Sequence, residues 1–438
     1  MHKRLLIIGT VPYDKQMTSR AFDSYFHNWE KENLAQIFSN QQEPLKGHCG
    51  TLFQITDKMM LKRRVKKNEN TGIIYYYKNL KKERKIGNVQ GNNGIIDKLY
   101  SLGKRKFPLN YLLRGILWKK KYWCTEKLLQ WADDFSPECI FLAFSDDFFI
   151  PEIALFFAER YDVPLISCIG DDYYFNDRFS VSPFYYIYRK KYKKLIDRVF
   201  AHGGSAAYIG DKIRDKYNSE FNLDGETVYL TSEIERQPFR MINTTNPKIT
   251  YCGNIRLGRN KSLAEVADVL AEINPDYHLE IYSNEKVDKY ISVLKNHKNI
   301  DYLGTVPYEI VKRKTVDSDI VVVVEGFDKK DVDITRYSLS TKVADSLASG
   351  RFVLGYGSAE CGAIDYLLKY ECGLTCTSYD ELLTKLKKAV FDADYQKQVY
   401  DTSERICNEH HTLENSNLIF EKIVNKAIRN YTKSNVKE

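Results

Sequence analysis

Long apolar runs and paired cysteines are both missing from this sequence of 438 residues. No stretch approaches the roughly 20 apolar residues that a membrane-spanning helix needs. The nine cysteines contain no Cys-x-x-Cys pair, which favours free thiols in a reducing compartment over disulfides or a zinc site. Heptad runs and internal repeats are missing too, which excludes a coiled coil and a solenoid.

The amino-terminal segment HKRLLIIGT lacks what a secretory signal requires. Such a signal has about 7–15 apolar residues before a cleavage site of small residues. Here the apolar stretch runs only from Leu5 to Ile8. We therefore expect residues 4–9 to form a first β-strand and the protein to be cytoplasmic.

Positive charge is concentrated in one segment of the chain. Between Lys58 and Lys121 there are 19 Lys and Arg residues against three acids, so this segment carries +16 and the rest of the chain −8. Aromatic residues from Tyr75 to Trp118 are interleaved with the cations. Such a segment is either a solvated basic face or a surface for an anionic partner, namely a membrane or a nucleic acid.

Hydrophobic residues make up 43% of the chain, which is enough for packed cores in two domains. Short apolar runs alternate with helical patterns, and this alternation indicates an α/β fold whose parallel sheets are covered on both faces. In a first domain, residues 1–240, we expect strands at 4–9, 51–56, 72–77, 139–144, 164–169 and 198–201. The basic segment, about 58–121, is interpreted as an insertion into this domain.

A domain boundary is expected near residues 237–248, where two prolines interrupt a segment without apolar periodicity. In the second domain, residues 248–412, strands are predicted at 249–252, 278–282, 299–303, 320–324, 352–356 and 374–377. Residues 413–438 are predicted to form a helix that packs back on the N-terminal domain. Two doubly wound, Rossmann-like domains would then face each other across a cleft, with ligands at the carboxyl ends of the strands.

The first candidate site follows the strand at 249–252, where the sequence reads YCGNIRLGRNKS. Gly253 permits a tight turn, and three cations follow it: Arg256, Arg259 and Lys261. Cations beside a loop that leads from a strand into a helix suit a polyphosphate. The same residues would also suit an ordinary basic surface turn.

The second candidate site is SLSTKVADSLASG, which precedes another apolar strand. Ser340 and Thr341 are good N-cap residues for a helix that starts near Lys342, and the free N–H groups of a helix start bind anions. Asp345 lies in the first turn of this helix and could accept hydrogen bonds from a vicinal diol such as ribose. Taken alone, it would be a solvated residue that suits the helix dipole.

From about Lys248 to Val424, these segments together with the strand SDIVVVVEG resemble the nucleotide-binding domain of GT-B glycosyltransferases. The resemblance is closest to glycosyltransferase family 4 (glycosyl transferases group 1), and TKVADSLASGRFVL is its most specific part. It implies that Asp345 binds the ribose of the donor nucleotide and that Lys261, with Arg256 or Arg259, binds the diphosphate. The other residues of the implied donor site are Gly253, Ser340, Thr341 and Lys342.

The chain departs from the family pattern at two positions. The family often has two glutamates eight residues apart, whereas Tyr337 stands eight residues before Asp345 here. Asn254 follows Gly253 where the family often has Arg. The resemblance therefore names residues for the nucleotide but none for the transferred sugar.

The resemblance extends into the first domain. Thr18, Ser19 and Arg20 stand near the end of the loop after the first strand and are expected to face the acceptor. In PLISCIGDDYYF, Asp171 and Asp172 follow a buried strand, and His202 follows the strand expected at 198–201. The resemblance makes these last three residues catalytic candidates. An Asx turn for the two aspartates and a structural role for His202 are the alternatives.

The implied reaction is hexosyl transfer, with retention, from a nucleotide-diphosphate sugar, and it needs no further cofactor and no metal. The DVD at Asp331–Asp333 looks like a metal motif, but we expect it in a loop without supporting ligands. The expected acceptor is a glycan or lipid-linked glycan of bacterial surface polysaccharide, such as a capsule, reached at the anionic inner leaflet of the membrane.

Two alternative hypotheses remain. One is a nucleotide-sugar epimerase on the same fold. The other is a basic nucleic-acid-binding protein that uses the segment 58–121. Because the sequence has no recognisable nucleic-acid-binding motif, we expect no nucleic acid as a partner.

Overall fold

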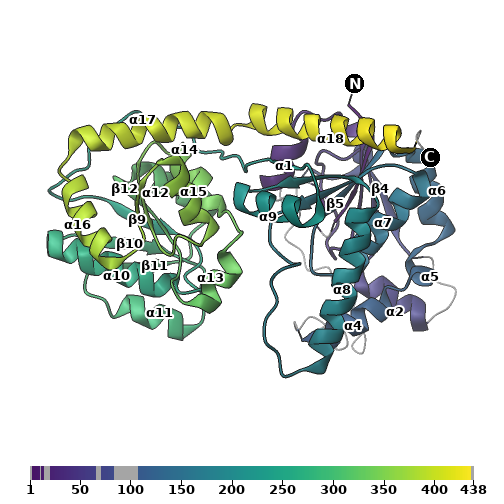
Figure 1. Ribbon diagram of the computed structural model, residues 1–438, viewed down its shortest axis with the longest axis horizontal. Helices are drawn as coiled ribbons and strands as arrows, with labels where there is room; N and C mark the ends of the chain where they lie inside the picture. The colour runs from purple at the N-terminus through teal and green to yellow at the C-terminus, as the bar shows by residue number, and fades with distance from the viewer. Residues whose placement is uncertain (1, 10, 14–19, 66–70, 83–106, 436–438) are drawn as a thin grey trace. The chain divides into compact units, whose positions relative to one another are not determined.

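The computed structural model describes residues 2–9, 11–13, 20–65, 71–82 and 107–435, which form two compact units (Figure 1). The first unit comprises Met1–Val228 together with Asn417–Glu438, and the second comprises Tyr229–Ser416. Each unit is built on a largely parallel β-sheet with helices packed against it. None of the helices in the described ranges is both long enough and apolar enough to cross a membrane.

The described residues of the first unit contain eight strands: β1 Leu5–Ile8, β2 Leu34–Phe38, β3 Thr51–Gln54, β4 Ile73–Tyr76, β5 Cys139–Ala143, β6 Leu165–Ile169, β7 Gly204–Tyr208 and β8 Glu226–Thr227. They form one sheet in the order β4-β3-β2-β1-β5-β6-β7-β8. Neighbouring strands are parallel except for β3 and β4, which pair antiparallel at one edge.

Helices cover both faces of this sheet. They are α1 Arg20–Phe26, α2 Asp57–Val65, α4 Pro108–Leu117, α5 Lys120–Trp123, α6 Glu126–Phe135, α7 Phe149–Tyr161, α8 Pro183–Ala201, α9 Asp211–Phe221 and most of α18 Leu413–Asn435, with single 3-10 turns at Lys31–Asn33 and Tyr77–Asn79. Because side chains alternate along a strand, Leu6 and Ile8 of β1 pack with α6 and α7 in one core. Leu5 and Ile7 pack with α1 and α18 in the other.

The second unit has a wholly parallel sheet in its described residues. Its strands are β9 Ile249–Cys252, β10 Leu279–Tyr282, β11 Ile300–Gly304, β12 Ile320–Val324, β13 Phe352–Tyr356 and β14 Leu374–Cys376, in the order β11-β10-β9-β12-β13-β14. Its helices are α10 Arg259–Ile273, α11 Asp288–Lys295, α12 Tyr308–Asp317, α13 Lys329–Thr335, α14 Thr341–Ala348, α15 Gly362–Tyr370, α16 Tyr379–Ala389 and α17 Ala393–His410. The strands alternate with helices along the chain, as the sequence pattern predicts.

Helix α8 corrects one expectation. Residues 198–201, expected as a strand, are its last turn. Buried Tyr188, Tyr192, Ile196 and Val199 recur every three to four residues, which is the spacing of a helix and not of a strand. The strand of this region is β7, which begins only at Gly204. In addition, β2 is missing from the strands expected above.

The two units divide after Val228, which is earlier than the boundary expected near 237–248. Residues 229–240 belong with the second unit because their polar groups bond within it. Arg236 donates from Nη1 to the Leu347 carbonyl at 2.6 Å and from Nη2 to Ser403 Oγ at 3.0 Å.

The carboxyl-terminal part of α18 completes the core of the first unit. Phe420 is fully buried there. Its ring centroid lies between 5.1 and 5.6 Å from those of Tyr25, Phe26, Trp29 and Phe141. Nearby, the Asn417 amide donates to the Ser24 carbonyl at 3.1 Å. Residues at the two ends of the sequence therefore share one core.

We expect Phe420→Ala to lower the free energy of unfolding of the first unit by about 3–5 kcal/mol, because it leaves a cavity among aromatic rings. Exposed Leu418, two residues earlier, provides the control, and Leu418→Ala should change stability by less than about 0.5 kcal/mol. Urea unfolding followed by near-ultraviolet circular dichroism measures both. Equal stability of the two variants would contradict the burial of this helix.

Candidate functional site

Strand order in the second unit determines where a ligand can bind. The chain builds β9, β10 and β11 outward to one edge and then places β12 on the other side of β9. In open α/β sheets the loops after two such strands diverge, and ligands bind there at the carboxyl ends. These loops are residues 253–258, after β9, and residues 325–328, after β12.

Glycines bring the two loops into contact. A Cβ on Gly326 would lie 2.4 Å from the Leu257 carbonyl oxygen, and a Cβ on Gly258 would lie 2.9 Å from Gly326 Cα. Gly258 also has a φ of +76°, which residues with side chains rarely adopt. Gly253 has a φ of +149°, and a Cβ there would lie 2.8 Å from Lys342 Nζ. Larger residues at Gly258 or Gly326 would force the loops apart.

A buried ion pair fastens the same two loops. Arg259, the first residue of α10, donates from Nε and Nη2 to the two carboxylate oxygens of Glu325 at 3.0 and 2.9 Å. Arg259 is 8% exposed and Glu325 only 2%. Burial alone would lower the pKa of Arg259, but the adjacent Glu325 carboxylate raises it above its usual value. Ser262 Oγ donates to the Glu325 carbonyl at 2.8 Å and completes the junction.

The other two cations expected to bind phosphate also have carboxylate partners. Arg256 donates from Nη2 to Glu285 at 2.9 Å, and Lys261 Nζ lies 2.9 Å from Asp328. The Lys261–Asp328 pair lies at the surface, where such pairs contribute little. The Arg256 side chain is half exposed, whereas its partner Glu285 is only 5% exposed. Arg259 differs because its charge is neutralised in the interior. Arg259 therefore holds the two loops together, whereas Arg256 and Lys261 are exposed cations, each with one carboxylate partner.

Helix α14 begins beside Gly253. Ser340 is its N-cap, and its Oγ accepts a hydrogen bond from the Lys342 backbone N–H at 3.4 Å. Lys342 Nζ donates to Tyr251 Oη at 3.0 Å, and within the described residues no carboxylate lies within 4.0 Å of it. Thr341 is exposed in the first turn. An ammonium group without a carboxylate partner, next to the N–H groups of a helix start, suits an anion.

Asp345 lies one turn further along α14. Its Oδ1 accepts a hydrogen bond from Ser232 Oγ at 2.6 Å. The Cys252 thiol, at the end of β9, has its pKa raised by burial to about 12; the charge of Lys342 lowers this pKa and that of Asp345 raises it. Both charges therefore act at the carboxyl end of β9. The structure brings together Gly253, Lys342 and Asp345, as the sequence predicts for one site.

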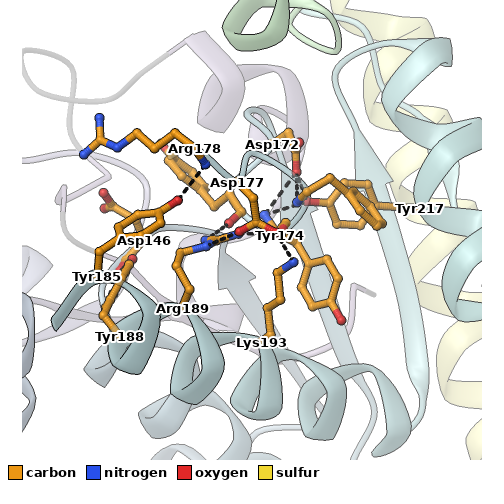
Figure 2. A network of polar contacts seen from close by, with 12 residues as sticks. Asp146, Asp172, Tyr174, Asp177, Arg178, Tyr185, Tyr188, Arg189, Lys193 and Tyr217 are labelled. Atoms are coloured by element: carbon orange, nitrogen blue, oxygen red, sulfur yellow. Dashed lines mark hydrogen bonds and ion pairs between the residues drawn. The ribbon is translucent and has the colours of Figure 1, made fainter. Parts of the chain in front are cut away.

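In the first unit, Asp171 and Asp172 follow β6. Asp172 is buried, and its Oδ1 accepts hydrogen bonds from the backbone N–H groups of Tyr174 and Phe175 at 3.0 and 2.8 Å. It also accepts from Tyr217 Oη at 2.7 Å (Figure 2). This is the Asx turn that the sequence left open as an alternative. Asp171 is exposed.

His202 lies at the amino-terminal ends of the strands, which corrects its expected place at a strand's carboxyl end. It precedes β7, and its Nε2 is 3.0 Å from the carbonyl oxygen of Val163, which precedes β6. Because Asp171 and Asp172 follow β6, roughly a strand length, about 16 Å, separates them from His202. His202 instead contacts the Tyr431 ring, with centroids 5.4 Å apart. It therefore has no place in a common catalytic group with the two aspartates.

Part of the acceptor-side prediction falls outside the described ranges. Thr18 and Ser19 lie there, and for Arg20 the structure gives only its position as the first residue of α1. The basic segment is described except at 66–70 and 83–106. Within the described part, Arg114 binds the carboxylates of Asp57 and Asp147 at 3.1 and 2.5 Å, so its charge is already compensated.

The DVD motif also lies elsewhere than expected. Asp331 and Asp333 belong to helix α13 and not to a loop. Asp333 forms surface ion pairs with Lys329 and Arg336. Within the part of the chain that the structure describes, no three His, Cys, Asp or Glu residues are grouped so that they could hold a metal ion.

Sequence reasoning missed a cavity of about 310 Å³ in the first unit. It is lined by Pro108, Tyr111, Asp146, Asp172, Tyr173, Asn176, Arg178, Tyr185, Tyr188 and Arg189. Figure 2 shows how Arg189 organises one wall: its guanidinium donates to the carbonyl oxygens of Tyr173 and Tyr174, both at 2.6 Å, and to Asp177 at 2.7 Å.

The cavity combines aromatic faces with polar groups of both charges. Asp146, in the loop after β5, accepts a hydrogen bond from Tyr111 Oη at 2.8 Å. Burial, followed by the charge of Asp146, raises the pKa of Tyr111 above its usual value, so this hydroxyl remains a donor. Arg178 is exposed, and among the described residues no carboxylate lies within 4.0 Å of its guanidinium. The spacing of these residues in the sequence gave no signal, because they come from four separate segments.

Comparison with solved structures identifies the fold. HepE from Anabaena, in complex with UDP, has a TM-score of 0.59 and 10% identity, over 97% of this chain and 100% of that one. TarM has a TM-score of 0.58 and 10% identity, over 97% and 99% of the two chains. A glycosyltransferase from Rickettsia africae has a TM-score of 0.52 and 10% identity, over 99% and 100%.

This chain has a GT-B fold. The predicted fold class, two Rossmann-like domains with C-terminal helices, is thus confirmed. No family model and no curated protein sequence matches the chain. At 10% identity the comparison establishes the GT-B fold alone. Assignment to family 4 stays a prediction that rests on the sequence resemblance.

We expect Glu325→Ala to destabilise the second unit by about 3–5 kcal/mol, because it leaves the buried guanidinium of Arg259 without a partner. Replacing both residues, as in Arg259→Met with Glu325→Leu, should restore most of the loss. Lys261→Ala breaks a pair that is exposed on both sides and should cost less than about 1 kcal/mol. Differential scanning calorimetry measures all three. If the double variant were no more stable than Glu325→Ala, the loss would not arise from an unpaired charge.

Proposed function

We propose that this protein is a glycosyltransferase that transfers a sugar from a nucleoside-diphosphate sugar to an acceptor. The observation that carries this proposal is the grouping of Lys342, Asp345 and the start of α14 at the carboxyl end of β9. Structures of HepE, which has a similar fold, contain UDP, UDP with glucose, or UDP-glucose. The same ligand chemistry fits the groups present here.

Each donor-binding group has a separate task in this proposal. The Lys342 ammonium and the first N–H groups of α14 bind the diphosphate, and the Asp345 carboxylate accepts hydrogen bonds from the ribose hydroxyls. Lys261 and Arg256 add charge by leaving Asp328 and Glu285, respectively, for a phosphate oxygen. Arg259 positions their loop through Glu325 and does not itself supply a free charge.

The reaction that we propose is hexosyl transfer with retention. Its transition state resembles an oxocarbenium ion, as in glycoside hydrolysis, while negative charge develops on the departing nucleoside diphosphate. Fixed positive groups stabilise that charge without reorganisation at the moment of bond cleavage. The nucleotide sugar is the only small molecule that the reaction needs besides the acceptor, and we assign the chain to family 4 on its sequence motifs.

The acceptor that we propose is a glycan or a lipid-linked glycan in the synthesis of bacterial surface polysaccharide, such as a capsule, at the cytoplasmic face of a membrane. The cavity in the first unit supports a saccharide. Its tyrosine rings offer apolar faces for sugar C–H groups, while Asp146, Asn176 and Arg178 can bond hydroxyl groups. Asp171 and Asp172 remain candidates at the carboxyl edge of β6.

We expect Lys342→Ala and Asp345→Ala each to weaken binding of a nucleoside diphosphate by about tenfold to a hundredfold, since each removes a charge-assisted hydrogen bond of roughly 1.5–3 kcal/mol. Isothermal titration calorimetry with UDP and GDP measures the change. Lys261→Ala should have a smaller effect, because that lysine must first leave Asp328.

The matched control is Lys388→Ala, an exposed lysine on α16, which should bind nucleotide as the wild type does. Unchanged affinity in both Lys342→Ala and Asp345→Ala would contradict the donor site. An epimerase would convert the nucleotide sugar without an acceptor and without releasing nucleoside diphosphate. Product analysis by chromatography separates that reaction from transfer.

Sugar transfer should continue when EDTA is added, because Lys342 and the start of α14 take the place of a divalent cation beside the diphosphate. Release of nucleoside diphosphate in the presence of acceptor extracts measures the rate. Loss of activity in EDTA that magnesium or manganese restored would show that a metal is required.

A further inference from the structure

Exposed apolar side chains gather on two segments of the first unit. Of the 22 large hydrophobic residues exposed in the described part of the chain, nine lie within residues 107–116 and 179–187. They are Phe107, Leu109, Leu113, Ile116, Phe179, Val181, Phe184, Tyr186 and Ile187. Exposure is extreme at Phe179 and Val181, at 87% and 92%. Clustered exposure of this kind marks an interaction surface, whereas single exposed residues do not.

Helix α4 contributes one of these segments as a single apolar face. Leu109, Leu113 and Ile116 recur at i, i+4 and i+7, so they lie in one row along the helix. The opposite side packs on α8, where Tyr111 and Leu112 contact the cluster around Tyr188. The row of three therefore faces outward, and none of the residues of α4 is buried.

Helix α8 contributes to the second segment, and its outer face changes from apolar to basic along its length. Tyr185, Tyr188 and Tyr192 are buried on the inner face. On the outer face, the first turns expose Phe184 and Ile187, and the following turns expose lysines: Lys190, Lys191 and Lys194. Phe184 and Lys191 are separated by seven residues, or about 10 Å of helix. The two helices lie side by side in the first unit (Figure 1), and the rings of Tyr111 and Tyr188 contact each other with centroids 4.8 Å apart.

Positive charge predominates on this surface, although exposed Asp177 borders it and pairs with Arg189 and Lys193. Residues 107–121 and 178–194 contain ten Lys and Arg residues and no Asp or Glu. Six of these cations are lysines that have no carboxylate within 4.0 Å among the described residues: Lys119, Lys120, Lys121, Lys190, Lys191 and Lys194. An apolar surface bordered by uncompensated cations is complementary to a layer of anionic headgroups over hydrocarbon.

We propose that the apolar face of α4 and the segment 179–187 insert into the interfacial layer of an anionic phospholipid bilayer. Apolar residues such as Leu113 and Phe184 enter the boundary of headgroups and acyl chains, about 5–10 Å deep. The lysines one or two turns behind them remain at the level of the phosphates. The association is peripheral and reversible. It gives the proposed glycosyltransferase a membrane partner, and it rests on that function only for its biological purpose.

Co-sedimentation with vesicles tests the proposal on the full chain. Wild-type protein should bind vesicles that contain phosphatidylglycerol at low salt and bind pure phosphatidylcholine vesicles far more weakly. The double variant Leu113→Ser with Phe184→Ser should lower partitioning by roughly tenfold or more. Lys190→Gln with Lys191→Gln should lower it by roughly fivefold for each lysine, and this difference should shrink at high salt.

Val293→Ser with Leu368→Ser is the matched control, since both residues are exposed apolar side chains of the second unit. It should partition as the wild type does. The surface assignment is overturned if Leu113→Ser with Phe184→Ser binds vesicles normally, or if wild-type protein ignores phosphatidylglycerol at low salt. Self-association in sedimentation velocity that this variant abolishes, without vesicle binding, would instead show an interface between protein molecules.

Nucleoside-diphosphate binding, measured on the same preparations, separates this proposal from the proposed function. Both double variants and the control should bind nucleotide with unchanged affinity, because all substitutions of the docking surface lie in the first unit. Vesicle binding without nucleotide binding would retain the docking surface and contradict the transferase. Nucleotide binding without vesicle binding would retain the proposed transferase and contradict the docking surface.

Discussion

The buried ion pair between Arg259 and Glu325 is the contact on which the candidate site depends. It joins the start of α10 to the end of β12, and these are the two elements that flank the switch point of the sheet. Removing two charges from water is costly, and their mutual attraction and two parallel hydrogen bonds offset this cost. Because separation would leave two unpaired charges in the interior, the glycine contact between Gly258 and Gly326 is held as well.

The cations around this site therefore differ in which group, if any, balances their charge. Arg259 is neutralised inside the protein, and the exposed side chains of Arg256 and Lys261 are paired with Glu285 and Asp328. Lys342 has a hydroxyl partner, Tyr251, which leaves its charge uncompensated. An anion that binds here would find Lys342 without a carboxylate partner, whereas Arg256 and Lys261 would each have to leave a carboxylate. Counting cations in the loop sequence would treat all of them as equal.

The sequence predicts the second unit well because its strands are buried apolar runs; β12, with the bounds predicted, is a run of β-branched residues. The prediction fails at residues 198–201, where an equally short apolar run is the last turn of a long helix. This error places His202 at the wrong end of the strands. The sequence predicts which types of residue occur in the candidate site, but it does not predict which of these residues pair with one another. Arg259 and Glu325 are 66 residues apart, and no local pattern connects them.

The position of Phe420 has a consequence for how the protein is made. Most of the first unit is synthesised before the second, yet part of its core comes from residues 417–435, which are synthesised after it. Its aromatic cluster, including Tyr25 and Phe141, stays open to solvent while the whole second unit is translated. The second unit is continuous in sequence and can fold first. The first unit can therefore complete its core only after the second unit has been translated, whereas amino-terminal domains generally fold before later ones.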